Sequence, residues 1–198
     1  MSRSPDPDRP RALLDLVVAY FLEHGLSDLS LRPLAKAVGS SPRVLLYYFE
    51  SSEKLIALAL ARLRDQQRET YLRIFEVDVA SPADMYLAIW KHMTAPAYAP
   101  MFRLFFEVYG LALRDPDKYR AFLTTAIDDW LDFIDTPEAR KQYGRAGSRA
   151  FATLIVSAYR GFMLDYCASQ DLKRVERAVK LWIGMVTAMD EQTIRGLA

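Results

Sequence analysis

The most constraining feature of the chain is residues 27–55, where two short helical patterns meet at an abrupt break. Ser30 precedes an apolar-periodic run and suits a helix N-cap, because its hydroxyl accepts a first-turn N–H. Gly39 ends the run, because glycine adopts positive φ without steric cost. Ser41 and Pro42 then begin a second helix as its N-cap and first residue. We therefore predict a helix-turn-helix over this segment.

A helix-turn-helix can place its second helix in the major groove of DNA, with the N-terminal side chains at the base edges. Arg43 is the predicted base-reading residue, because arginine bridges two acceptors of guanine, and Val44 suits a thymine methyl group. An ordinary corner between two helices has the same local pattern, so the turn alone leaves both interpretations open. The predicted DNA-binding residues are Ser30, Arg32, Ser41, Pro42, Arg43, Val44, Tyr47, Tyr48 and Lys54.

The segment from Arg9 to about Leu58 resembles the N-terminal domain of the TetR family of bacterial transcriptional regulators. The resemblance rests on an amphipathic helix over residues 12–24, then residues 29–35, 38–45, the aromatic group 47–49, and residues 51–55. It implies an all-α fold, with an N-terminal three-helix helix-turn-helix DNA-binding domain followed by a helical ligand-binding and dimerisation domain. It also implies a homodimer that binds double-stranded operator DNA and senses a small-molecule effector.

The chain departs from the family pattern at three positions. Leu46 stands where the family usually has tyrosine, Ser40 where an apolar residue is common, and Ser52 where lysine is common. The family's tyrosine and lysine typically touch phosphates. We therefore expect Tyr47, Tyr48 and Lys54 to supply phosphate contacts in their place.

The charge of the chain gives DNA binding little support. The formal net charge is +1, and residues 1–55 contain as many acidic as basic side chains. Non-specific affinity for DNA comes mainly from neutralising phosphates, so a neutral segment opposes the DNA-binding interpretation. The basic residues must then gather on one face. Arg32, Arg43 and Lys54 lie near predicted helix N-termini, whose N–H groups also bind phosphate.

Length and composition fit a small N-terminal domain and a larger helical body. At 198 residues and 52% hydrophobic content, the chain can bury a sizeable core. We expect a disordered arm over residues 1–10, the helix-turn-helix domain over 11–55, and the ligand-binding and dimerisation domain over 56–198. The chain has no apolar run of about 18 residues, no secretory signal and a single cysteine, so we expect no membrane association and a cytoplasmic location.

The body shows helical periodicity and no strand pattern. The predicted helices cover residues 51–75, 81–94, 101–113, 116–134, 148–168 and 171–195. The last two are apolar on two sides, which requires two packing partners for each helix. We predict a homodimer through these last two helices. The alternative is that both helices lie at the centre of a single subunit.

Aromatic residues are frequent in the body, and core packing explains most of them. The resemblance implies that some line a small-molecule pocket, since helical bundles often bind ligands between their helices. The candidate ligand-binding residues are Trp90, His92, Phe106, Tyr109, Asp129 and Tyr159.

Patterns that indicate catalysis or metal binding are missing from the sequence. The two histidines and one cysteine have no metal-ligand spacing, and no phosphate-binding loop or nucleophile elbow occurs. Asp128, Asp129, Asp132 and Asp135 are most simply a solvated acidic face. We expect no catalytic residue, metal or cofactor. The sequence thus predicts a ligand-responsive transcriptional regulator, a repressor that binds palindromic operator DNA; the alternative is a helical small-molecule-binding or enzymatic domain without a DNA role.

Overall fold

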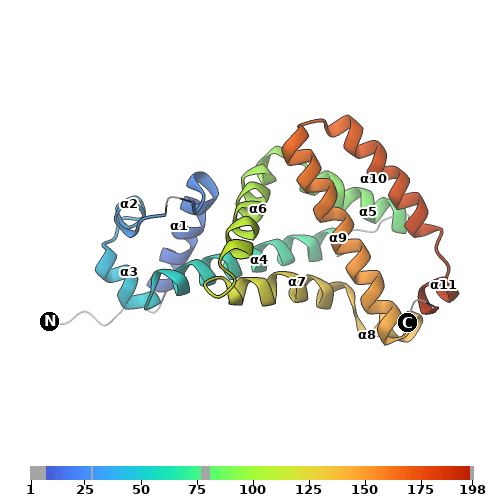
Figure 1. Cartoon of the computed structure of the whole chain (residues 1–198), viewed down its shortest axis with the longest axis horizontal. Helices are drawn as coiled ribbons and strands as arrows, with labels where there is room; N and C mark the ends of the chain where they lie inside the picture. Colours follow the sequence, from blue (N-terminus) through green and yellow to red (C-terminus); the bar gives the residue numbers. More distant parts are fainter. Residues whose placement is uncertain (1–7, 28, 77–80, 197–198) are drawn as a thin grey trace. The chain divides into compact units, whose positions relative to one another are not determined.

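The structure, a computed structural model, describes residues 8–27, 29–76 and 81–196, and within these ranges every regular element is helical (Figure 1). The predicted all-α fold class is confirmed. The elements are α1 (Arg9–His24), α2 (Leu31–Ala37), α3 (Pro42–Phe49), α4 (Ser52–Glu76), α5 (Pro82–Met93), a 3-10 turn η1 (Pro96–Tyr98), α6 (Ala99–Arg114), α7 (Arg120–Ile134), α8 (Pro137–Tyr143), α9 (Arg145–Ser169), α10 (Leu172–Thr187) and α11 (Glu191–Arg195).

Several helix boundaries differ from the sequence prediction; for example, α9 begins at Arg145 rather than at 148. Residues 1–7 of the predicted arm lie outside the described residues, but Arg9 already belongs to α1. The helix expected from 116 begins only at Arg120, because the Asp115 carboxylate accepts the N–H of Lys118 at 3.3 Å and holds a local turn. The long C-terminal helix is divided into α10 and α11, because Asp190 accepts the N–H of Thr193 at 2.6 Å and caps a new helix.

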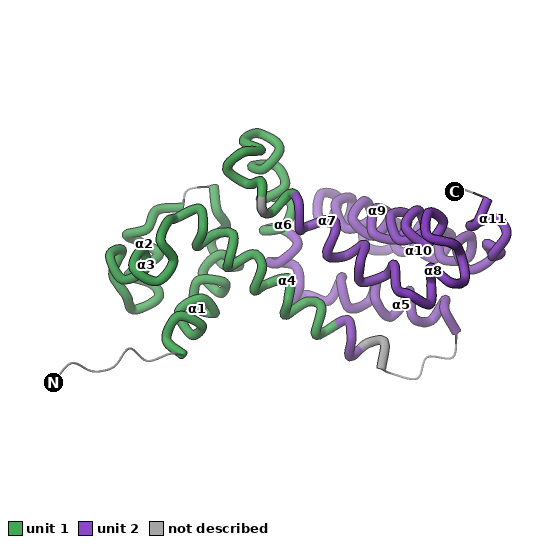
Figure 2. Tube along the Cα trace, turned by 90° about the horizontal axis from the view of Figure 1, so that it is seen from below, with its two compact units in different colours: residues 1–70, 103–123 green, residues 71–102, 124–198 purple. Residues whose placement is uncertain are grey.

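The chain divides into two compact units (Figure 2). Unit 1 comprises residues 1–70 and 103–123, and unit 2 comprises residues 71–102 and 124–198. The divisions fall inside α4, α6 and α7. The unit that contains the helix-turn-helix therefore also includes most of α4 and the second part of α6.

The core of unit 1 is built from buried apolar residues of each of its first four helices. Phe21 of α1, Leu34 of α2, Leu45 of α3 and Leu55 of α4 are each at most 1% exposed. An ion pair adds a tie between α1 and α4, with Nε of Arg62 2.8 Å from Oδ1 of Asp15. This core fixes α3 against its neighbours and leaves the other side of α3 uncovered.

A carboxylate of α6 closes the turn between α1 and α2. Oε1 of Glu107 accepts the backbone N–H of Leu26 at 2.9 Å, and the N–H and hydroxyl of Ser27 at 2.6 Å each. Gly25 has a φ of +72°, and a Cβ atom there would lie 2.5 Å from Oε2 of Glu107. The turn after α1 is thus held by one side chain that is distant in sequence.

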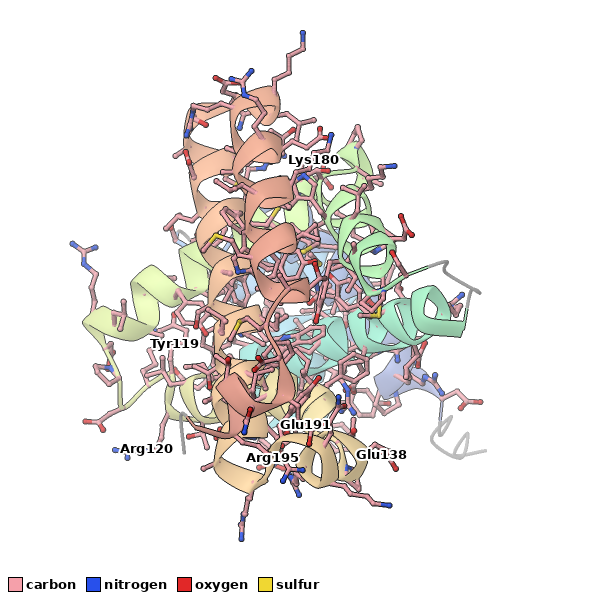
Figure 3. The ribbon with its side chains drawn as sticks, turned by 90° about the vertical axis from the view of Figure 1, so that its right-hand side faces the viewer. Tyr119, Arg120, Glu138, Lys180, Glu191 and Arg195 are labelled. Carbon is pink, nitrogen blue, oxygen red and sulfur yellow. The ribbon has the colours of Figure 1, made fainter. Side chains whose placement is uncertain are left out.

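In unit 2, a charged side chain ties the C-terminal helix α11 to α8. Figure 3 shows Glu191 and Arg195 of α11 near Glu138 of α8. The Arg195 guanidinium donates to the carbonyl oxygens of Gln142 at 2.6 Å and Lys141 at 3.1 Å. Basic side chains stabilise the carbonyl groups that a helix end leaves without partners, so Arg195 caps α8.

One aspartate of the predicted acidic face is buried rather than solvated. Asp135 is 4% exposed and accepts hydrogen bonds from Arg140 at 3.1 and 3.0 Å and from the hydroxyl of Ser148. The hydrogen bonds from Arg140 lower the pKa of Asp135 below its ordinary value. Asp128 and Asp132 pair instead with Arg149 of α9. Asp128, Asp132 and Asp135 therefore connect the end of α7 to α8 and α9.

Candidate functional site

The turn between α2 and α3 has the geometry expected of a helix-turn-helix. Gly39 has a φ of +64°, and nothing lies within 4 Å of the position of an added Cβ, so the backbone conformation alone requires glycine there. The N–H of Ser40 returns to the carbonyl of Ala35 at 2.8 Å. Ser41 caps α3 by accepting the N–H of Val44 at 3.3 Å. Ser30 occupies the N-cap position of α2, but its side chain makes no capping hydrogen bond.

One face of α3 is exposed, and its opposite face is in the core. Arg43, Leu46 and Tyr47 are exposed on α3 with a spacing of i, i+3 and i+4, and Glu50, directly after the helix, is exposed as well. We call these four residues the α3 stripe. Tyr47 is 73% exposed. Such a face, free of the protein's own packing, is what a helix needs to enter a groove of DNA.

The other predicted DNA-binding residues gather at helix N-termini. Ser30 and Arg32 are exposed at the start of α2, and Lys54 is exposed in the first turn of α4. At the start of α3, Ser41 is exposed and Pro42 half-buried, while Val44 and Tyr48 are half-buried along its side. Free N–H groups at helix N-termini favour anions such as phosphate. A role of these residues in DNA binding stays a prediction.

Glu50 has an unusual backbone conformation that the sequence did not reveal. Its φ is +66° and its ψ −51°, and the N–H of Ser51 donates to the carbonyl of Phe49 at 2.8 Å across it. This is a γ-turn with positive φ, a rare and strained conformation. Its carboxylate lies 2.5 Å from Nζ of Lys54. Sequence reasoning missed Glu50, because glycine is the usual signal for positive φ.

Unit 2 contains a first group of aromatic rings contributed by α4, α5, η1 and α7. The ring of Tyr71 lies 5.5 Å from that of His92 and 5.3 Å from that of Trp130, measured between centroids. The rings of His92 and Tyr98 are 4.0 Å apart. The two longer distances are typical of aromatic packing contacts, and the rings of His92 and Tyr98 lie closer than that range.

A second group of rings in unit 2 connects α5, α9 and α10. The hydroxyl of Tyr159 donates to the backbone carbonyl of Tyr86 at 2.6 Å. The ring of Trp182 lies 5.2 Å from that of Tyr159 and 5.7 Å from that of Phe162, and Phe162 also contacts Trp90 at 6.3 Å. Within the described residues, the indole N–H groups of Trp90 and Trp182 are buried without an acceptor. A buried donor without a partner is uncommon and calls for an explanation.

Both groups of rings disfavour charge of either sign. Burial raises the pKa of Tyr86 to about 12, and it raises the pKa values of Tyr71 and Tyr159 further still. Burial also lowers the pKa of His92 below its ordinary value. Since desolvation penalises the phenolate anions and the imidazolium cation alike, the surroundings favour uncharged groups.

The candidate ligand-binding residues fall in both units. Trp90, His92, Asp129 and Tyr159 belong to unit 2, whereas Phe106 and Tyr109 belong to unit 1. Trp90, His92 and Tyr159 lie in the aromatic groups, and Asp129 is half-buried on α7. The sequence did not single out Tyr71, Tyr86, Tyr98, Trp130, Phe162 and Trp182. Their only signal is aromatic character, which core packing explains equally well.

The helices α9 and α10 combine a buried apolar side with an exposed one. Val179 of α10 is 0% exposed, whereas Leu181 is 68% and Met185 63% exposed. On α9, Leu154 and Leu164 are 40% and 52% exposed. Large apolar side chains that remain exposed in one subunit are a common sign of an interface.

Metal and membrane sites are not found in the part of the chain that the structure describes. Over residues 8–27, 29–76 and 81–196, no group of three histidine, cysteine, aspartate or glutamate side chains is arranged to hold a metal ion. No helix of the same ranges is both long and apolar enough to span a membrane.

Solved structures of transcriptional regulators share the fold. A putative TetR-family transcriptional regulator from Rhodococcus sp. matches with a TM-score of 0.73 at 17% sequence identity, over 92% of this chain and 100% of the other. A transcriptional regulator from Rhodococcus sp. Rha1 matches with a TM-score of 0.68 at 20% identity, over 89% and 95% of the two chains. The multidrug binding protein EbrR, complexed with imidazole, matches with a TM-score of 0.64 at 18% identity, over 93% and 98%.

Comparisons of the sequence alone give no assignment. No protein-family model matches the chain, and no curated protein matches it. The structural comparisons nevertheless confirm, at the level of the fold, the likeness to TetR-family transcriptional regulators that residues 9–58 indicated.

Proposed function

We propose that the protein is a ligand-responsive transcriptional regulator of the TetR family, a cytoplasmic repressor that binds palindromic operator DNA as a homodimer. The observation that carries the proposal is the α3 stripe, an exposed helix face that follows a helix-turn-helix turn at Gly39. The shared fold of transcriptional regulators supports the same conclusion. No catalytic role is proposed for any residue.

The proposed DNA contacts divide into base contacts and phosphate contacts. Arg43 reads a guanine through its two donors, and Val44 meets a thymine methyl group. Ser41 and Pro42 set the start of α3 against the groove. The phosphate-binding residues are Ser30, Arg32, Tyr47, Tyr48 and Lys54, which fix the register of the domain on the duplex without reading its sequence.

The proposed dimer forms through α9 and α10. Leu181 and Met185, exposed on α10, would be covered by the same surface of a second copy. Two copies related by a two-fold axis present two α3 helices to half-sites about one helical turn, or more, apart. A palindromic operator is the DNA counterpart of this symmetry.

We propose that the effector binds in the aromatic groups of unit 2 and that its binding releases the protein from DNA. Trp90, His92 and Tyr159 are the proposed contacts, with Trp130 and Trp182 added from the structure. The unpartnered indole N–H groups and the uncharged surroundings suit a planar, uncharged ligand with a hydrogen-bond acceptor. Release requires the ligand to favour the non-binding conformation by about 1–3 kcal/mol or more.

The test of DNA binding uses fragments of the protein's own genomic neighbourhood and two variants. Arg43→Ala should weaken binding to the preferred fragment by about 1–3 kcal/mol, measured by fluorescence anisotropy, and relax the base preference at one position. Arg32→Ala, as a phosphate-contact control, should weaken binding to all fragments alike. Wild-type affinity in Arg43→Ala would remove the base-reading assignment. Absence of DNA binding by the wild type would favour a helical ligand-binding domain without a DNA role.

A further inference from the structure

An exposed carboxylate lies directly after α3, the helix that carries the proposed base-reading residue. Glu50 follows Phe49, the last residue of α3, and is exposed, as are Arg43 and Tyr47 within the helix. Because its φ is +66°, its side chain does not follow the helical spacing of the α3 residues. Its negative charge is nevertheless at the end of the helix that is proposed to enter a groove of DNA.

The same carboxylate holds the nearest basic side chain. Nζ of Lys54 lies 2.5 Å from Oε1 of Glu50, and the two side chains are 50% and 71% exposed, respectively. An ion pair this exposed contributes little to the stability of the fold. Lys54 is therefore neutralised by a neighbour that the fold does not need for its stability.

The backbone at Glu50 makes a glutamate there more unexpected. A residue with a Cβ is strained at a φ of +66°, whereas glycine adopts positive φ readily. The exposed ion pair with Lys54 is the contact that a long acidic side chain makes at this position.

We infer that Glu50 restrains sequence-independent DNA binding by neutralising Lys54 and repelling phosphate. This inference rests on the proposed DNA-binding function. Glu50 is one of the acidic residues that balance the basic residues within residues 1–55. Because the contribution of phosphate contacts to the affinity is then low, one copy of the domain binds DNA weakly. Stable binding to DNA requires the base contacts of both copies in a dimer. A modest loss of affinity on ligand binding is then enough for release.

The test is a salt titration that needs no knowledge of the operator. Wild type and Glu50→Gln are titrated against a fluorescent random-sequence duplex of about 30 base pairs, enough for two half-sites one turn apart. In the wild type, Glu50 competes with the phosphate for Lys54. In Glu50→Gln, Lys54 neutralises that phosphate without competition, which adds about one unit of neutralised charge per copy. The salt slope of log K should steepen by about 1 per copy, and affinity at about 0.1 M salt should rise about eightfold per copy.

Two further variants separate this role from net charge and from folding. Glu53→Gln removes the same charge, but Glu53 lines a small hollow with Lys118 and Tyr119 rather than the α3 stripe, so the salt slope should stay at the wild-type value. The double variant Glu50→Gln, Lys54→Gln should also keep the wild-type slope, because the freed cation is gone. The thermal midpoint of each variant, measured in parallel, should match that of the wild type.

The outcomes distinguish this inference from the proposed function. If the wild type binds DNA and the slope of Glu50→Gln is unchanged, the role of Glu50 is refuted and the proposed function stands. The role of Glu50 is refuted equally if Glu53→Gln or the double variant steepens the slope as much as Glu50→Gln does. If neither the wild type nor Glu50→Gln binds any duplex at low salt, both proposals are refuted.

Discussion

Glu107→Ala should open the turn between α1 and α2 without unfolding the rest of unit 1. The carboxylate accepts one hydrogen bond from the N–H of Leu26, a residue only 5% exposed, and two from the exposed Ser27. Water can replace the partners of Ser27, but a buried N–H left without an acceptor loses about 1–3 kcal/mol. We take about 2 kcal/mol, which corresponds to about a thirtyfold change in an equilibrium constant.

Amide hydrogen exchange measures this change at the residues concerned. The Leu26 amide should exchange about thirtyfold faster in Glu107→Ala, while amides in the core of unit 2 keep their rates. Glu107→Gln retains an acceptor without the charge and should show a smaller increase. Glu23→Ala, which removes an exposed carboxylate at the end of α1, is the matched control. Unchanged exchange at Leu26 in Glu107→Ala would show that Glu107 does not hold the turn.

Two further predictions concern unit 2. Asp135→Asn should destabilise the protein by about 1–3 kcal/mol in urea at neutral pH, because Ser148 and Arg140 lose a charged acceptor. Folding lowers the pKa of Asp135, so the wild type should be more stable than Asp135→Asn at pH values above the ordinary aspartate pKa near 3.8, and this difference in unfolding free energy should disappear as the pH falls below that value. A difference that persists in acid would contradict this. Leu181→Glu should convert a dimer to a monomer in sedimentation, whereas Lys173→Glu, on the charged face of α10, should not; a dimeric Leu181→Glu protein would exclude the α10 interface.

The helix-turn-helix was predictable because its signals are local. Gly39 fixes the turn by its φ, and Ser41 and Pro42 fix the start of α3, so neighbouring residues alone determine the geometry. The buried residues of α2 and α3, such as Leu34 and Leu45, follow from helical spacing in the same way.

The features that sequence reasoning missed depend on contacts between distant residues or on backbone strain. Glu107 closes the turn at Ser27 although the two residues are 80 positions apart in the sequence, and nothing in the sequence around either residue indicates this contact. Asp135 belongs to an acidic pattern that is typical of a solvated face. It is buried because Ser148 and Arg140, which follow it in the chain, pack against it and donate hydrogen bonds to it. Glu50 adopts positive φ without being glycine, so no residue preference could reveal the γ-turn that directs its carboxylate to Lys54.

If two copies of α3 read DNA together, the operator must contain two related half-sites. Selection of bound duplexes from a random pool with the wild-type protein should therefore enrich an inverted repeat whose half-sites lie about one helical turn or more apart, with a guanine preference in each half that Arg43→Ala loses. Recovery of unrelated sequences with no repeated half-site would show that the two copies do not read DNA together.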